Sequence, residues 1–190
     1  MYKAYLFEQE KLITDDMIDS LFQILPEKRK KQALSYHKRV DRNNCIITFV
    51  LLKIALRRCF GIIDFTIQYE KRGKPYLKEH PDVFFNISHC ADGCIVVVAD
   101  EQIGVDMQNF IPFSWEVAER VCCSEEIEVL RCTQNREFEF IRMWTMKESY
   151  LKMTGVGIGE NLKQVNTLVI KDIEIIQRGN SMIAICRNSE

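Results

Sequence analysis

The chain has 190 residues, of which 47% are hydrophobic and 28% charged, and its formal net charge at pH 7 is −1. This is the composition of a globular protein long enough to bury a sizeable core. The charge excludes a chain that binds polyanions over its whole surface, and no run approaches the roughly 20 apolar residues of a membrane span. The first residues do not follow the order of a signal peptide, so we expect a cytoplasmic protein.

The first third of the chain predicts one strand followed by helices. A strand is expected at residues 1–7 and a helix at 14–25. Residues 26–61 have a helical pattern but are too long for one typical helix, so they predict two. Residues 65–77 alternate like a strand and then turn at 73–75.

The remainder predicts strands, then helices, then strands again. Strands are expected at 83–89 and within 94–108, where two strands are joined near residues 100–102, and the last two are expected at 165–177 and 181–188. Residues 115–132 and 135–155 are helical in pattern. The fold class is α+β, with helices packed on mostly antiparallel strands. The halves, 1–102 and 103–190, have a similar order of elements, although no convincing sequence repeat relates them; we call their boundary the seam.

The cysteines argue against one kind of site, and the basic residues are concentrated in one segment. The eight cysteines contain no C-x-x-C pair, which argues against a zinc site and for reduced, mostly buried thiols. Residues 27–58 hold ten of the 26 Lys and Arg residues but two of the 27 Asp and Glu residues. This segment is a solvated helix face, a site for phosphates or an acidic partner, or a nucleic-acid surface. Taken alone, the solvated face is the simplest interpretation.

The stretch WTMKESYLKMTGVGIG (144–159) ends a predicted helix in a glycine-rich turn. On a helical wheel Lys147 falls inside the apolar arc, Glu148 lies at its edge, and Lys152 lies one turn beyond Glu148. Glu148 and Lys152 are either an exposed i,i+4 ion pair or a metal ligand or base with a neighbouring cation. Lys147 would cross the seam or extend along the apolar face.

Two strand segments carry polar residues. In IGVDMQ (103–108), alternation places Asp106 and Gln108 on one face with Gly104, which leaves room there. The alternative is a polar face in water. In FFNISHC (84–90), Asn86 and Ser88 share a face and His89 lies where the strand ends; a lone histidine is more often structural than catalytic.

Together these residues favour a metal-assisted reaction on a phosphorylated substrate. The oxygen ligands suited to Mg²⁺ are Asp106, Gln108 and Glu148. The positive charge for a multiply phosphorylated substrate comes from Lys28, Lys31, Lys74, His89 and Lys152. This combination predicts phosphoryl-type transfer, in which positioning and charge neutralisation provide most of the catalysis.

The same segments resemble the surfactin-type 4'-phosphopantetheinyl transferases. The matching stretches are FNISH (85–89), IGVDMQ (103–108) and WTMKESYLKMTGVGI (144–158), with similar stretches at 26–31, 36–42 and 73–77. They occur in the family's order and cover residues 26–159. The resemblance implies a pseudo-dimer of two similar α/β halves with the active site at the seam. It also implies Mg²⁺-dependent transfer of 4'-phosphopantetheine from coenzyme A to a serine of an apo acyl or peptidyl carrier protein, releasing adenosine 3',5'-bisphosphate.

The resemblance also assigns expected roles by position. Metal ligands would be Asp106, Gln108 and Glu148. The 3'-phosphate of coenzyme A would meet Lys28 and Lys31, with Arg42 or Asn43 close by. The nucleotide and pyrophosphate would contact Lys74, Ser88, His89 and Lys152. The expected catalytic residues are Glu148, as a base for the carrier serine, Lys152 and His89.

One residue departs from the family pattern. The family commonly has an acid where this chain has Gln108, so we expect weaker metal binding but not lost activity. The alternative is a non-catalytic protein of the same fold that binds coenzyme A or a carrier protein. We expect a monomer acting in secondary metabolism, with no nucleic acid and no membrane as partners.

Overall fold

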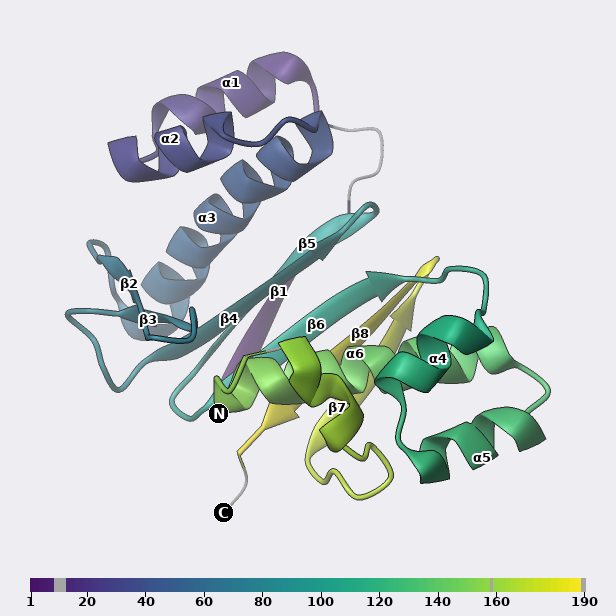
Figure 1. The fold of residues 1–190 in the computed structure, drawn as a ribbon. Coiled ribbons are helices and arrows are strands. Elements are labelled where there is room, and N and C mark those ends of the chain that lie inside the picture. Colours follow the sequence, from purple (N-terminus) through teal and green to yellow (C-terminus); the bar gives the residue numbers. More distant parts are fainter. Residues whose placement is uncertain (9–12, 158, 189–190) are drawn as a thin grey trace.

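The computed structural model describes residues 1–8, 13–157 and 159–188 (Figure 1). The elements of the first half are β1 (Tyr2–Glu8), α1 (Asp15–Gln23), α2 (Glu27–Leu34), α3 (Arg39–Phe60), β2 (Ile67–Tyr69), β3 (Pro75–Leu77), β4 (Phe84–Cys90) and β5 (Gly93–Ala99). Those of the second half are β6 (Ile103–Asn109), α4 (Trp115–Val121), α5 (Ser124–Cys132), α6 (Arg136–Thr154), the 3₁₀ helix η1 (Gly159–Gln164), β7 (Ile173–Arg178) and β8 (Ser181–Arg187).

The structure confirms the predicted α+β class and most of the elements, with three local differences. The segment 65–77 is two short antiparallel strands, and its turn lies at Glu70–Gly73, before Pro75, which begins β3. The helical segment 115–132 is interrupted after Val121, because the Cys123 N–H is bonded to Glu126 and a new helix starts there. The predicted strand 165–177 begins only at Ile173.

The two main sheets have the same topology. Their strand orders are β1-β5-β4 and β6-β8-β7, and every pairing within them is antiparallel. In each half the central strand is therefore the last one, flanked by the first and the penultimate strand. This correspondence gives the pseudo-dimer that the resemblance implied. Whether residues 1–102 and 103–190 are separate folding units stays a prediction.

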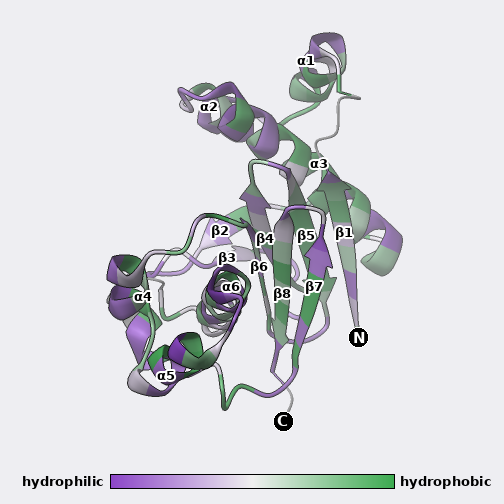
Figure 2. Ribbon diagram, turned by 90° about the vertical axis from the view of Figure 1, so that its right-hand side faces the viewer, coloured by the Kyte–Doolittle hydropathy of each residue, from purple (hydrophilic) through white to green (hydrophobic). Residues whose placement is uncertain are grey.

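Apolar packing joins the sheets to each other and to one long helix each. β5 is buried on both faces: Ile95 and Val97 pack with strands of the second half, and Val96 and Val98 pack in the cluster beneath α3. On the other side, α6 packs on β6 and β8. Figure 2 shows the strands grouped centrally, with α6 and α3 on opposite sides. A strand buried on both faces explains the uninterrupted apolar run at 94–99.

At the seam β4 lies beside β6, but side chains join them in place of a backbone ladder. The side chain of Asn86 accepts a hydrogen bond from the Val105 N–H at 3.2 Å. The Ser88 hydroxyl accepts one from the Met107 N–H at 3.0 Å. Because residue numbers rise together along both strands, β4 and β6 run parallel. These two bonds satisfy buried N–H groups on either side of Asp106.

Among the described residues, every helix is too short or too polar to traverse a lipid bilayer.

Candidate active site

The helix α6 has a capped start and a glycine end, and it packs closely on β6 at the seam because residue 104 is a glycine. The Asn135 side chain accepts from the Phe138 N–H at 3.1 Å, and Gly155 ends the helix at φ 71°. Gly104 on β6 faces the helix backbone, where an added Cβ would lie 2.0 Å from the Ser149 carbonyl oxygen and 2.5 Å from the Met153 nitrogen. The room that Gly104 leaves on this face of β6 is therefore filled by helix α6.

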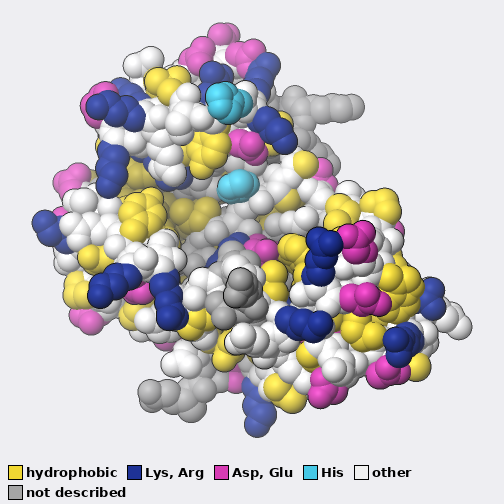
Figure 3. Space-filling model, in the orientation of Figure 1, with side chains coloured by type: hydrophobic (Ala, Val, Ile, Leu, Met, Phe, Trp, Pro, Cys, Tyr) yellow, Lys and Arg dark blue, Asp and Glu magenta, His cyan; other side chains and the backbone are white. Residues whose placement is uncertain are grey.

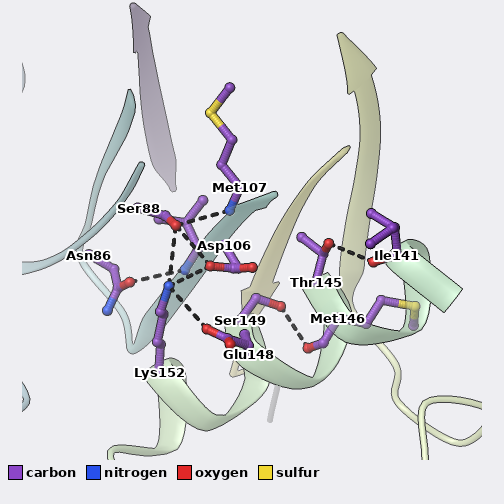
Figure 4. A network of polar contacts seen from close by, with 11 residues as sticks. Asn86, Ser88, Asp106, Met107, Ile141, Thr145, Met146, Glu148, Ser149 and Lys152 are labelled. Atoms are coloured by element: carbon purple, nitrogen blue, oxygen red, sulfur yellow. Dashed lines mark hydrogen bonds and ion pairs between the residues drawn. The ribbon is translucent and has the colours of Figure 1, made fainter. Parts of the chain in front are cut away.

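Three charged side chains meet on this helix face, and we call Asp106, Glu148 and Lys152 the acid–lysine cluster (Figure 4). The Lys152 Nζ lies 2.5 Å from Asp106 Oδ1 and 3.7 Å from Glu148 Oε2. The side chain of Glu148 is 17% exposed and that of Asp106 is 5% exposed. The i,i+4 pair of Glu148 and Lys152 therefore exists, but it is largely buried and not on a solvated edge.

The acid–lysine cluster contains more negative than positive charge. Burial raises the pKa of Glu148 above its ordinary value, the neighbouring Asp106 raises it further, and Lys152 opposes the rise. The Oδ2 atom of Asp106 is buried and has no hydrogen-bond partner among the described residues. A buried unpaired carboxylate oxygen beside a second carboxylate is an arrangement that a divalent cation would stabilise.

The donor set fits Mg²⁺. Asp106 and Glu148 offer charged oxygens. By strand alternation Gln108 lies on the same face of β6 as Asp106, and it offers an amide oxygen. Within the described ranges, no three His, Cys, Asp or Glu residues are grouped as a metal site. A metal here would thus have two carboxylate ligands, and Gln108, substrate oxygens or waters would complete its coordination.

Ser88 and His89 lie next to this cluster. The Ser88 hydroxyl donates to Asp106 Oδ1 at 2.8 Å and accepts from Met107 N–H and from Lys152 Nζ, the latter at 3.2 Å. Its hydrogen-bonding capacity is filled by these partners. Burial lowers the pKa of His89, and the Lys152 charge lowers it further while Asp41 at the start of α3 opposes this. His89 is therefore mainly neutral at pH 7, and it lies between the cluster and α3.

A pocket of about 300 Å³ opens at the seam beside the acid–lysine cluster. Its lining includes Arg72, Lys74, Asn86, Lys152, Gly155 and Gly157. Figure 3 shows this face hollowed between the upper helical lobe and the lower half, with Lys and Arg side chains around the hollow. Three cationic side chains and no carboxylate line the pocket, so it favours an anionic ligand.

Lys74, which lines this pocket, connects the halves. Its ammonium donates to the Met153 carbonyl near the end of α6 and to the Gln102 side chain. Burial lowers the pKa of Lys74, and Glu70 opposes that change. Lys74 is thus held at the pocket by contacts within the protein, and its predicted contact with a nucleotide stays a prediction.

The remaining predicted phosphate contacts lie on α2 and α3. Lys28 and Lys31 are exposed on α2, and the Lys28 ammonium lies 5.9 Å from the centre of the Tyr69 ring. Arg42 Nε and Asn43 Oδ1 are buried at the start of α3 and have no hydrogen-bond partner among the described residues. Polar atoms left in this state favour a ligand there, and the assignment of all four residues to the 3'-phosphate stays a prediction.

Lys147 has a structural role that the sequence did not reveal. It is fully buried, its Nζ lies 2.7 Å from Glu126 Oε2, and it donates to the carbonyl oxygens of Leu162 and Val165. All these partners belong to the second half. Both expectations for Lys147, crossing the seam and extending along the apolar face, are wrong. A lysine in an apolar arc signals a buried partner, but it does not identify Glu126, 21 residues away.

Asn86 is a second residue of the site whose role the sequence did not reveal. It is 4% exposed, bonded to β6, and lines the pocket. The only signal in the sequence was its place on the same strand face as Ser88.

Comparisons with known proteins are consistent with this geometry. A family model described as the 4'-phosphopantetheinyl transferase superfamily matches residues 102–188, and one described as 4'-phosphopantetheinyl transferase, N-terminal, matches residues 14–103. The 4'-phosphopantetheinyl transferase Sfp of Bacillus subtilis strain 168 is 30% identical over 156 residues, which are 80% of this chain and 69% of that protein.

For two other relatives, the match spans a smaller share of the relative's length. A 4'-phosphopantetheinyl transferase of Bacillus subtilis is 32% identical over 70% of this chain and 60% of that protein. The L-aminoadipate-semialdehyde dehydrogenase-phosphopantetheinyl transferase of Xenopus laevis is 34% identical over 50% of this chain and 36% of that protein.

Proposed function

The chain belongs to the surfactin-type 4'-phosphopantetheinyl transferases, and from this premise we propose that it transfers 4'-phosphopantetheine from coenzyme A to a serine of an apo acyl or peptidyl carrier protein. The products are the holo-carrier protein and adenosine 3',5'-bisphosphate. The observation that carries the proposal is the acid–lysine cluster, with its unpaired Asp106 Oδ2, at the edge of a cation-lined pocket.

Mg²⁺ is the metal we propose for this reaction, held by Asp106 and Glu148 with Gln108 as the third protein ligand. When bound, it supplies charge neutralisation to the pyrophosphate and polarises the phosphoryl oxygen. The proposal is supported by the oxygen-only donor set and by the excess of negative charge that Lys152 leaves uncompensated.

The chain's own residues bind and orient the substrates. Lys152 lies between two carboxylates and lines the pocket, and in this proposal its ammonium binds pyrophosphate oxygens. Glu148 accepts the proton of the carrier serine, directly or through a water molecule. The serine oxygen then bonds to the phosphorus that carries pantetheine, and the bond from that phosphorus to adenosine 3',5'-bisphosphate breaks.

The remaining residues are proposed to bind the phosphates of coenzyme A, in keeping with the positive charge of the pocket. Lys74 and His89 contact the nucleotide and pyrophosphate, and Ser88 joins them by redirecting its hydroxyl hydrogen from Asp106 to a phosphate oxygen. The 3'-phosphate is bound by Lys28, Lys31, Arg42 and Asn43. Because both halves of the site come from one chain, we propose that the protein acts as a monomer. A role in secondary metabolism follows from the resemblance to the surfactin-type family, and action in the cytoplasm is part of the same proposal.

The test is the intact mass of an apo carrier protein incubated with this protein, coenzyme A and Mg²⁺. Transfer adds about 340 Da, the mass of one phosphopantetheine group. EDTA and Glu148→Ala should each abolish the gain, whereas Glu137→Ala, at an exposed position of the same helix, should leave it intact. Coenzyme A binding without any gain on several unrelated carriers would favour the non-catalytic alternative and identify Gln108 as the residue to examine.

A further inference from the structure

We propose that Arg29 is a positioning residue for the 3'-phosphate of coenzyme A, because it holds helix α2, which carries Lys28 and Lys31, in place on α3. This inference rests on the proposed function and adds to it a residue that acts through those two lysines. Arg29 is half-buried, whereas Lys28 and Lys31 are exposed.

The guanidinium of Arg29 joins α2 to α3. Its Nε and one terminal nitrogen both donate to the carbonyl oxygen of Cys45, at 3.2 and 2.9 Å. That terminal nitrogen also donates to the Thr48 hydroxyl at 3.2 Å, and the other one donates to the Gln32 side chain at 2.8 Å. The guanidinium carbon lies 5.6 Å from the centre of the Phe49 ring. A planar fork that meets several acceptors fixes the orientation of the two helices as well as their separation.

Apolar packing contributes little to the position of α2. All of its residues are described, and of these only Ala33 is buried. No side chain caps the start of the helix at Pro26. Because a helix of this length is marginal by itself, its place depends on tertiary contacts. The hydrogen bonds of Arg29 are therefore the main directional contacts that hold α2 against α3.

Arg29 thereby links two parts of the proposed phosphate site. Helical spacing places Lys28 and Lys31 on one face of α2. The anchor point, Cys45, follows Asn43 by two residues on α3, where Asn43 Oδ1 and Arg42 Nε are buried without a hydrogen-bond partner among the described residues. A shift of α2 would move both lysines relative to the start of α3. Binding of the 3'-phosphate would then weaken, whereas the contacts with the rest of coenzyme A would remain.

A conservative substitution separates the position of α2 from the charge of residue 29. Arg29→Lys keeps the positive charge, but a single ammonium cannot span the same acceptors. Keeping the charge matters because Arg29 acts on the site electrostatically: burial is the main cause of the lowered pKa of His89, and nearby cations including Arg29 lower it further. The matched control is Arg57→Lys, at an exposed position near the other end of α3.

The experiment measures the affinities for coenzyme A and for 3'-dephospho-coenzyme A by calorimetry, together with the melting temperature. The wild type should bind coenzyme A more tightly. Arg29→Lys should reduce this preference by about fivefold or more and change the affinity for the dephospho compound by less than about twofold. Arg57→Lys should keep the preference. A folded Arg29→Lys protein with an unchanged preference, or with both affinities weakened equally, would overturn the inference.

A second variant covers the case in which Arg29→Lys does not fold. Thr48→Val keeps the shape of the side chain but removes one acceptor of Arg29 on α3, so it should reduce the preference in the same direction by about two- to threefold. An unchanged preference in Thr48→Val would then overturn the inference. A wild type that binds both compounds equally would overturn it while leaving the transfer reaction standing. A wild type that binds neither compound would overturn the proposed function as well.

Discussion

The buried ion pair between Lys147 and Glu126 gives the sharpest stability prediction. Both side chains are fully buried. In Lys147→Met, Glu126 keeps three donors, the N–H and hydroxyl of Thr167 and the N–H of Cys123, but its charge is no longer compensated. The carbonyl oxygens that accepted from Lys147 also lose their donor.

Breaking one partner of a buried pair costs about 3–5 kcal/mol in the free energy of unfolding. For a chain of this size, each kcal/mol corresponds to roughly 2–4 °C, so the melting temperature should fall by about 6–20 °C. Urea unfolding and calorimetry measure both quantities. Lys53→Met, at an exposed position of α3, should change the unfolding free energy by less than about 0.5 kcal/mol.

A second substitution and a pH series identify the cause. Adding Glu126→Gln to Lys147→Met removes the uncompensated charge and keeps an acceptor oxygen, so it should recover about 1–2 kcal/mol. Burial favours a higher pKa for Glu126, but hydrogen bonds from Lys147 and Thr167 hold it below the ordinary value. The wild type should therefore lose stability as pH falls through that pKa. Lys147→Met should instead gain stability on acidification, because protonation removes the uncompensated charge of Glu126. The reasoning would be refuted if the difference in unfolding free energy between the wild type and Lys147→Met stayed constant on acidification. It would also be refuted if Lys147→Met lost less than about 1 kcal/mol of unfolding free energy at pH 7.

Three further predictions concern the site and the core. Gln108→Glu should lower the Mg²⁺ concentration that gives half-maximal transfer, and an unchanged Mg²⁺ dependence would show that residue 108 does not bind the metal. Gly104→Ala should lower the free energy of unfolding in urea by more than about 3 kcal/mol, because the added Cβ meets the α6 backbone. The control is Gly159→Ala, whose added Cβ meets nothing within 4 Å. Equal losses in the two variants would contradict the packing of β6 on α6. Iodoacetamide should label Cys59 and Cys132 in the folded protein and the buried cysteines only after denaturation, as read by peptide mass spectrometry.

The regular elements were predictable because their signals are local. α3 and α6 carry helical apolar spacing and end at Gly61 and Gly155, both of which have positive φ. The pattern failed where a tertiary contact decides the backbone. Residues 165–172 look strand-like, but Thr167 in this segment bonds to the buried Glu126.

The candidate site was predictable in composition and only partly in arrangement. The sequence identified Asp106, Glu148 and Lys152, and the structure brings them together. It did not reveal what joins β4 to β6, because Asn86 and Val105 are 19 residues apart on strands of different sheets. Contacts of this kind depend on how the halves dock, and periodicity carries no information about docking.

The central position of β5 and β8 has a consequence for how the chain folds. Tyr2 pairs with Ala99, and Ile103 pairs with Arg187, so each sheet joins residues from opposite ends of its half. Loops of this length must close before these strands contribute any stabilisation, which makes folding slow. During synthesis the second sheet cannot form until residues 181–187 have been made, and until then β6 and β7 have unpaired edges. A nascent chain at this stage is exposed to aggregation, and it would benefit from a chaperone that covers the edges.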